Sequence, residues 1–224
     1  MDGNTLRVAV AEFVGTFTLI FIGGGAGIVS GQDIVAVALA NGLAIGIMVS
    51  NLGHISGGHF NPAITLGFLS TRRITPVLAG VYWVAQFAGA TVAALLLRWF
   101  FKMPAMAASV PTLKHGFGAG QGMVLELILT IFLVGTVFAT AVDPGGAFKA
   151  VAGLTIGLII TIDVFTGGPI TGAAMNPARA FGPELVSGHW SNAWIYYVGP
   201  VLGGLIAALG YEYLYLKRPA AATT

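Results

Sequence analysis

Long apolar segments with very few charges are the feature that most constrains how this chain can fold. Only 8% of its 224 residues are charged, against about 25% in soluble domains, so most of its surface must face lipid. About 20 apolar residues cross a bilayer as a helix, and a helix satisfies its own backbone polar groups. The chain is therefore predicted to be an all-α membrane protein with six transmembrane helices, at about 7–29, 34–52, 76–101, 119–142, 148–166 and 192–216.

Composition also excludes several functional classes. The net charge of +2 is too small to indicate a nucleic-acid partner, and the absence of cysteine excludes disulfides, thiol catalysis and thiolate metal sites. No histidines stand with Asp or Glu at metal-ligand spacing, and no Ser-His-Asp arrangement is suggested. We therefore expect no enzyme activity, no cofactor and no metal, with membrane lipid as the surrounding partner.

The two halves of the sequence resemble each other, within a single membrane domain that spans residues 1–224. Glu12-x-x-x-Thr16 recurs as Glu126-x-x-x-Thr130, and further matches follow in the same order at offsets of 111 to 115. The first repeat covers 5–102 and the second 119–217. Each half contains three spans, an odd number, so the second half enters the membrane from the opposite face. Such inverted repeats place their functional site near the bilayer midplane, at broken helices.

One tripeptide occurs at equivalent positions of both halves, as Asn61-Pro62-Ala63 and Asn176-Pro177-Ala178. Asn is a favoured helix N-cap and Pro suits the first helical position. Each copy precedes about ten apolar residues, which span half a bilayer as a helix. We expect two re-entrant half-helices whose positive N-terminal ends face each other, repel cations and protons, and offer the two Asn amides to a passing solute.

The stretches before each tripeptide are small and flexible, which predicts an extended backbone. Irregular backbone at this depth is tolerated where it lines a water-filled cavity. We therefore expect these loops to line a pore and to turn carbonyl groups toward it; the candidate lining residues are Gly57, Gly58, His59, Gly172 and Ala174.

These residues resemble the aquaporin, or major intrinsic protein, family over nearly the whole chain. Ser56–Thr65 is similar to the family's first signature, Thr171–Pro183 to its second, and Ala11–Phe17 to its opening helix. The resemblance implies a right-handed bundle of six helices with two half-helices, assembled as a homotetramer with one pore per subunit. It also implies that Glu12 and Glu126 hold the half-helix loops extended; a proton relay is the alternative role.

The resemblance further implies a selectivity filter formed by Asn41, Val164, Ala173 and Arg179. Strict water channels of the family carry an aromatic residue and a histidine at the first two positions, so this filter should be wider. Val164 and Ala173 resemble plant tonoplast and nodulin-like intrinsic proteins. Glycerol facilitators usually carry Asp after the arginine, whereas this chain has Ala180. Water is the expected substrate, and glycerol, urea, ammonia and hydrogen peroxide form the wider hypothesis.

The sequence as a whole favours a passive channel that excludes protons and ions. An ion-coupled secondary transporter is the alternative, because inverted repeats occur there too. Basic residues number six on one side of the predicted membrane and three on the other, which favours both termini in the cytoplasm; the six are Arg7, Arg72, Arg73, Lys149, Lys217 and Arg218. We expect a cell-membrane protein, in a prokaryotic plasma membrane rather than an organelle.

Overall fold

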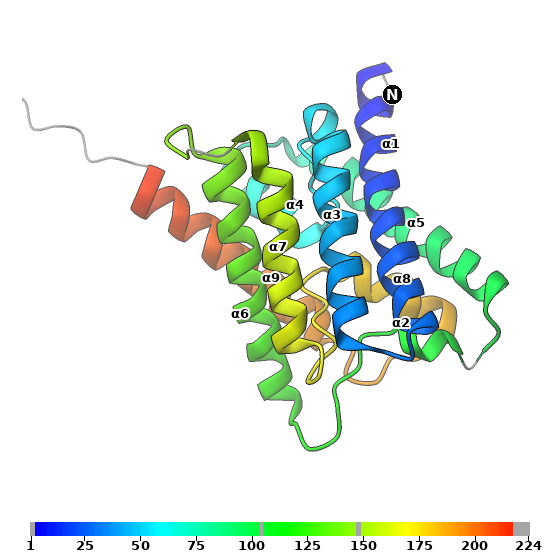
Figure 1. The fold of residues 1–224 in the computed structure, drawn as a ribbon. Coiled ribbons are helices and arrows are strands. Elements are labelled where there is room, and N and C mark those ends of the chain that lie inside the picture. Colours follow the sequence, from blue (N-terminus) through cyan, green and yellow to red (C-terminus); the bar gives the residue numbers. More distant parts are fainter. Residues whose placement is uncertain (1–2, 104, 147–148, 217–224) are drawn as a thin grey trace, which may run out of the picture.

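Six apolar helical spans and two short helices form the protein (Figure 1). The computed structural model describes residues 3–103, 105–146 and 149–216, so Lys217 and Arg218 lie outside the described residues. The first span joins α1 (Gly3–Thr18), a π-helical segment η1 (Leu19–Gly24) and α2 (Gly25–Val29). The other spans are α3 (Ile34–Ser56), α5 (Pro76–Phe100), α6 (Ala119–Val137, continued by η3 to Val142), α7 (Ala152–Gly167) and α9 (Ile195–Tyr211, continued by η5 to Leu216).

The predicted six spans are confirmed, with changes at their ends. Five of them are long and apolar enough to cross a membrane by length and composition, whereas α7 has only 16 residues. A short 3-10 turn, η4 (Lys149–Val151), precedes α7. The second span continues to Ser56, four residues past its predicted end, and stops where Gly57 adopts a left-handed conformation with φ of 89°.

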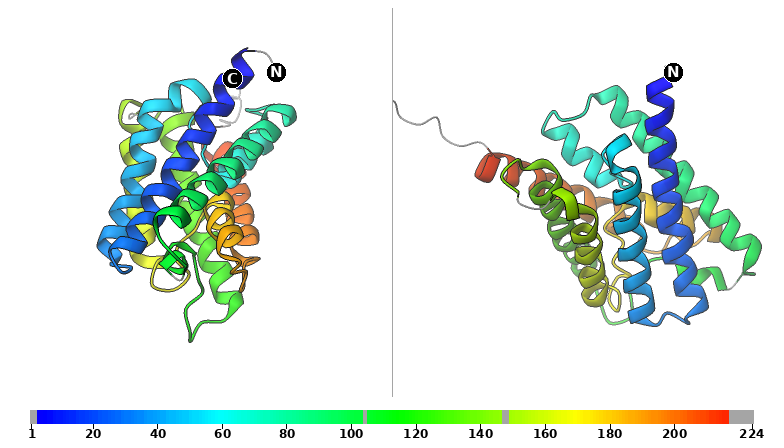
Figure 2. Two further views of the ribbon diagram at one scale, coloured as in Figure 1. Left: turned by 90° about the vertical axis from the view of Figure 1, so that its right-hand side faces the viewer. Right: turned by 45° about the horizontal axis from the view of Figure 1, so that its top comes forward.

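The two short helices lie inside the bundle, as the half-span prediction requires. Helix α4 (Pro62–Ser70) has nine residues and α8 (Pro177–Ser187) has eleven, or roughly 14 and 17 Å at 1.5 Å per residue. Each packs mainly on the opposite half of the chain: α4 against α9, and α8 against α5 (Figure 2). The two halves are therefore interleaved rather than side by side.

Helices α3 and α7 cross in close backbone contact, and glycines make this possible. A Cβ atom on Gly157 would lie 2.5 Å from the carbonyl oxygen of Gly42, and one on Gly153 would lie 2.6 Å from the carbonyl oxygen of Gly46. Small residues four apart are the usual means by which helices approach closely in lipid, where no hydrophobic force drives them together. This crossing fixes the positions of two helices that line the central cavity.

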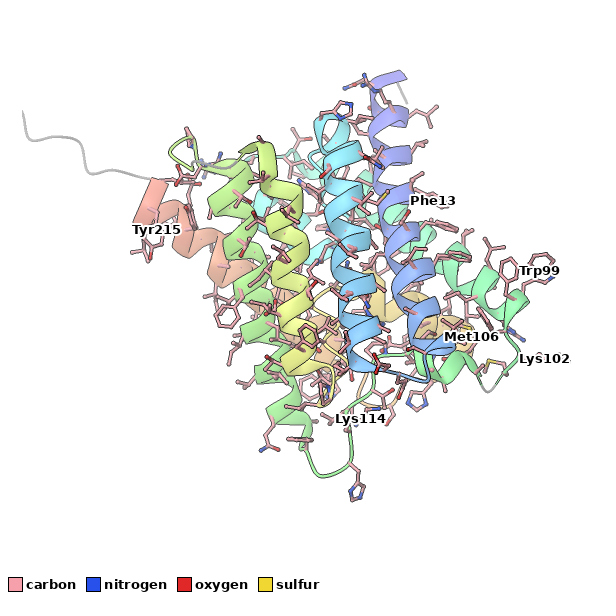
Figure 3. All side chains as sticks on the ribbon, viewed as in Figure 1. Phe13, Trp99, Lys102, Met106, Lys114 and Tyr215 are labelled. Atoms are coloured by element: carbon pink, nitrogen blue, oxygen red, sulfur yellow. The ribbon has the colours of Figure 1, made fainter. Side chains whose placement is uncertain are left out.

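The outer surface of the bundle is apolar. Large hydrophobic side chains such as Leu43 and Ile162 remain more than half exposed, which suits contact with lipid tails. The start of α1 and the end of α9 lie toward the same end of the molecule (Figure 1). Lys102 and Lys114 lie at the opposite end (Figure 3). An even number of membrane crossings requires this arrangement of the two chain ends.

Candidate functional site: a central pore between two half-helices

The two asparagines of the repeated tripeptide cap the half-helices that they begin. Asn61 has an extended backbone (φ −155°), and its Oδ1 accepts a hydrogen bond from Ala63 N at 2.8 Å. Oδ1 of Asn176 (φ −150°) accepts from Ala178 N at 3.0 Å and from Arg179 N at 3.2 Å. Pro62 and Pro177 occupy the first turn of each helix. The side-chain oxygens are thus used as caps, which leaves each amide NH2 group turned away from its own helix.

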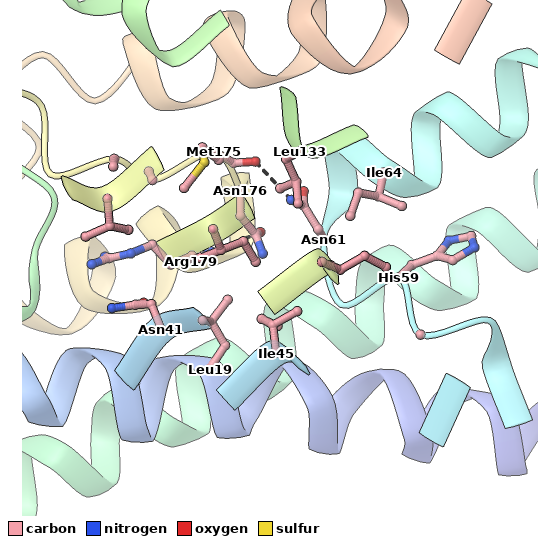
Figure 4. Close-up of a pocket in the computed structure, with 16 residues that line it drawn as sticks. Leu19, Asn41, Ile45, His59, Asn61, Ile64, Leu133, Met175, Asn176 and Arg179 are labelled. Atoms are coloured by element: carbon pink, nitrogen blue, oxygen red, sulfur yellow. Dashed lines mark hydrogen bonds between the residues drawn. The ribbon is translucent and has the colours of Figure 1, made fainter. Parts of the chain in front are cut away.

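The amide groups cross from one half of the chain to the other. Asn61 Nδ2 donates to the carbonyl oxygen of Met175 at 2.9 Å (Figure 4). Asn176 Nδ2 donates to the carbonyl oxygen of Phe60 at 2.9 Å. Sequence reasoning expected these amides, and the loop carbonyls, to face a passing solute. One N–H of each amide instead binds a loop carbonyl, so the tips of α4 and α8 are joined directly.

Phe60 and Met175 are held in a costly backbone conformation. Their φ angles are 48° and 52°, in the left-handed region that costs a residue other than glycine on the order of 1–3 kcal/mol. Each is held from both sides, because its N–H donates to a buried glutamate while its carbonyl accepts from the opposite Asn. These bonds fix the direction in which both loops enter the half-helices.

Glu12 and Glu126 perform the same task in the two halves. Glu12, fully buried, accepts from His59 N at 3.0 Å and Phe60 N at 2.6 Å. Glu126, also fully buried, accepts from Ala174 N at 3.0 Å and Met175 N at 2.7 Å. A hydroxyl also donates to each carboxylate, from Ser56 and Thr171 respectively. Each glutamate therefore binds the backbone that the family resemblance implied.

The first half carries one polar cluster that the second lacks. Gln86 Nε2 donates to Glu12 at 2.8 Å and to Thr65 Oγ1 at 3.0 Å. The same Thr65 hydroxyl lies 3.1 Å from His59 Nδ1. In the second half, Pro200 stands at the position equivalent to Gln86, and Ala180 at the position equivalent to Thr65. The His59 ring is thereby fixed by a hydrogen-bonded neighbour on α4, and it also packs on Phe68 and Tyr82.

A narrow cavity lies between the half-helix tips and the surrounding spans. The space open to the centres of water molecules amounts to about 30 Å3, enough for a short file of waters, since one needs roughly 10–15 Å3 by this measure. Most predicted site residues line it: Asn41, Gly58, His59, Asn61, Val164, Ala173, Ala174, Asn176 and Arg179. Gly57 does not line it. Pro62, Ala63, Pro177 and Ala178 are buried behind it, as parts of the half-helices.

The apolar wall of the cavity is the part that sequence reasoning missed. It consists of Leu19, Ile45, Ile64, Leu133, Ile156, Ile160 and Met175. Ile156, Ile160 and Val164 are spaced four residues apart on α7, a signal that could have indicated one helix face toward the pore. The cavity thus offers polar partners at the loops and at the predicted filter residues, and almost none along its sides.

A wider outer pocket adjoins the cavity at two of the predicted filter residues. In this outer pocket, the space open to the centres of water molecules is about 200 Å3. Val164 and Arg179 line both spaces, whereas Gly172 lines only the outer one. Arg179 Nη1 donates to the carbonyl oxygen of Ser109 at 3.0 Å, from the short 3-10 segment η2 (Ala105–Ser109). The larger outer pocket and the smaller central cavity therefore share these two side chains as lining.

Asn41 and Asp163 lie in the neighbourhood of this narrowing. Asn41 Nδ2 donates to Val37 O at 2.8 Å, within its own helix. Asp163, next to Val164 in sequence, is 3% exposed, and its Oδ2 has no hydrogen-bond partner among the described residues. The same described residues contain no group of three or more His, Asp or Glu that could hold a metal ion.

Comparison with known proteins agrees with this geometry. Relatives include aquaporin TIP4-4 of Zea mays (41% identical, covering 97% of this chain and 90% of that protein) and probable aquaporin TIP3-2 of Arabidopsis thaliana (43% identical, 94% and 84%). The X-ray structure of the aquaglyceroporin from Plasmodium falciparum superposes with a TM-score of 0.85 at 27% identity, over 94% of this chain and 96% of that one.

These relatives also decide between the alternatives left open by the sequence. They favour a channel over an ion-coupled transporter or an enzyme. They give no support to a prokaryotic plasma membrane, because the plant relatives are of the tonoplast intrinsic type. The major intrinsic protein family model matches residues 2–211, and the chain therefore belongs to this family, as a multi-pass membrane water channel of the aquaporin type.

Proposed function

We propose that water crosses this protein in single file past Asn61 and Asn176, and that small neutral solutes also pass the filter formed by Asn41, Val164, Ala173 and Arg179. The observation that carries the proposal is the narrow cavity at the half-helix tips, which adjoins a wider outer pocket at Val164 and Arg179. The proposed solutes are glycerol, urea, ammonia and hydrogen peroxide.

Exclusion of protons and ions follows from the charges along this path. The N-termini of α4 and α8 each carry about +0.5 of a charge, and Arg179 adds a full positive charge at the entrance. A cation would have to pass all three while losing its hydration in a cavity with an apolar wall. A water molecule loses fewer of its hydrogen bonds on entering the cavity, because the second N–H of each Asn amide can donate to its oxygen.

The small side chains at the proposed filter support passage of molecules larger than water. Val164 and Ala173 are small side chains, and the Asn41 amide is folded back toward Val37. Glu12 and Glu126 act as loop supports in this proposal rather than as a proton relay, because every carboxylate oxygen accepts hydrogen bonds from the loop or its neighbours.

Purified protein in vesicles tests the proposal. Shrinkage in an impermeant osmolyte should be faster than in empty vesicles, and re-swelling in glycerol or urea should be faster too, while an internal pH dye should report no added proton leak. The double variant Asn41→Phe/Val164→His should keep water flow and lose urea and glycerol flow. Water flow without solute flow in the wild type would refute the wide filter. Unchanged solute flow in the double variant would show that these two positions are not the constriction.

We also propose the assembly and the membrane orientation that the sequence predicts. The proposed homotetramer has one pore per subunit, and the two repeats, 5–102 and 119–217, lie in one domain with both termini in the cytoplasm. The exposed apolar faces of the spans support burial against lipid or a further copy. Native mass spectrometry from detergent should give a tetramer, and a purely monomeric species would contradict this part.

A further inference from the structure

The first span departs from regular α-helix beside the filter. Its π-helical segment η1 (Leu19–Gly24) packs against α3. Such segments are rare and are frequent at functional sites. Leu19 lines the central cavity, and Gly23, four residues later, is buried against the Asn41 side chain. The segment therefore contributes to the pore at one residue and abuts a proposed filter residue at another.

The contact between Gly23 and Asn41 leaves no room for a side chain. A Cβ atom on Gly23 would lie 2.6 Å from Asn41 Cγ and 2.9 Å from Asn41 Nδ2. Ordinary contacts of a Cβ atom begin at 3.4 Å. The Asn41 carboxamide would have to retreat by about 1 Å to restore normal carbon–carbon spacing. Gly23 is not among the glycines with a positive φ, so this contact, rather than a left-handed backbone, is what requires glycine here.

The direction of that retreat follows from the surroundings of Asn41. The side chain is only 4% exposed and is anchored through Nδ2 to the carbonyl oxygen of Val37. Gly23 closes one side, and the central cavity is the open space that Asn41 borders. A displacement of 1 Å is large beside a water molecule of roughly 1.4 Å radius.

We propose that Gly23 is a positioning residue for selectivity: its missing side chain holds the Asn41 amide out of the passage and thereby sets the width of the filter for neutral solutes. This inference rests on the proposed function, because it assigns Asn41 to the filter. Gly23 itself touches no solute and acts only through Asn41.

The test is a double-mutant cycle in proteoliposomes with Gly23→Ala, Asn41→Ala and the two combined. Gly23→Ala should lower urea permeability several-fold and water permeability less. The combined variant should match Asn41→Ala, because the shortened side chain no longer has an amide to displace. A tenfold fall in permeability corresponds to about 1.4 kcal/mol in the barrier.

Gly25→Ala is the matched control on the same span. A Cβ atom there would meet Leu97 Cδ2 at an ordinary 3.4 Å, away from the filter, so both permeabilities should stay at the wild-type level. A purely structural effect of Gly23→Ala would lower water and urea permeability in the same proportion, and Asn41→Ala would not reverse it.

The outcomes separate this inference from the function beneath it. Wild-type vesicles that conduct no water would refute the proposed function. Conducting wild-type vesicles with a Gly23→Ala variant of unchanged urea-to-water ratio would refute the positioning role alone, as would failure of the combined variant to recover. If the wild type passes water only, the cycle is read by water permeability alone: Gly23→Ala should lower it, and the combined variant should match Asn41→Ala. An unchanged water permeability in Gly23→Ala, or a combined variant that conducts less than Asn41→Ala, would then refute the positioning role.

Discussion

Replacement of Glu126 by glutamine exchanges one oxygen for an NH2 group at the support of the second loop. Glu126 Oε1 accepts from Thr171 Oγ1 at 2.6 Å and from Ala174 N at 3.0 Å, while Oε2 accepts from Met175 N at 2.7 Å. A glutamine can keep the first two bonds with its one oxygen. Its NH2 group then faces the Met175 N–H, donor against donor.

The cost of that change can be worked from these contacts. One hydrogen bond to a charged acceptor is lost and a buried N–H is left unpaired, which together cost about 3 kcal/mol. For a chain of this size the thermal unfolding midpoint should fall by about 6–12 °C. Met175, whose φ of 52° depends on that bond, should also lose its fixed direction, so the Asn61 amide loses its partner and water permeability should fall several-fold.

Thermal unfolding in detergent and stopped-flow water permeability, at equal protein per vesicle, measure the two effects. Glu184→Gln is the control: Glu184 is 1% exposed, and its carboxylate accepts from Tyr197 OH at 2.7 Å, a bond that a glutamine oxygen can retain. It should leave the unfolding midpoint close to that of the wild type. A Glu126→Gln protein that unfolds at the wild-type temperature and conducts normally would refute the view that this carboxylate holds the loop.

Three further predictions test other features of the fold. Gly157→Leu should prevent stable assembly, because its side chain would enter the backbone of α3, whereas Gly135→Leu, where a Cβ meets nothing within 4 Å, should fold; equal yields after size-exclusion chromatography would contradict this. Asp163→Asn should raise the unfolding midpoint, since a buried carboxyl with an unpartnered oxygen is costly, and a lower midpoint would count against it. Arg73→Ala removes a partly exposed ion pair with Glu212 at 2.7 Å and should cost less than about 1 kcal/mol, so a large fall in the midpoint would be unexpected.

The features predictable from the sequence are those with local causes. The spans follow from continuous apolar composition, and the half-helix starts follow from Asn-Pro, because a cap and its proline act within a few residues. The equivalence of Glu12 and Glu126 appears in the repeat, although their role as loop supports came from family resemblance. The doubled tripeptide identifies the family more sharply than any single residue does.

The remaining features depend on contacts between residues far apart in the chain. The bonds from Asn61 to Met175 and from Asn176 to Phe60 join residues more than 110 positions apart. The local sequence around these residues does not predict either bond. Ile156 and Ile160 have the spacing of any packed helix, so their place in the cavity wall needs the neighbouring spans. The π-helical segment at Leu19–Gly24 lies within a continuous apolar run, and such a run gives no sequence signal that distinguishes π-helix from regular α-helix.

The crossed amide bonds also bear on the order in which the protein can be completed. Residues 5–102 are synthesised before the second repeat. The Phe60 carbonyl therefore has no partner until its donor, Asn176, has been synthesised. An unpaired carbonyl is costly in hydrocarbon, which favours keeping α4 near the aqueous boundary until α8 arrives. The two short helices can therefore complete each other only after both repeats have been made, and neither repeat alone would contain a complete pore.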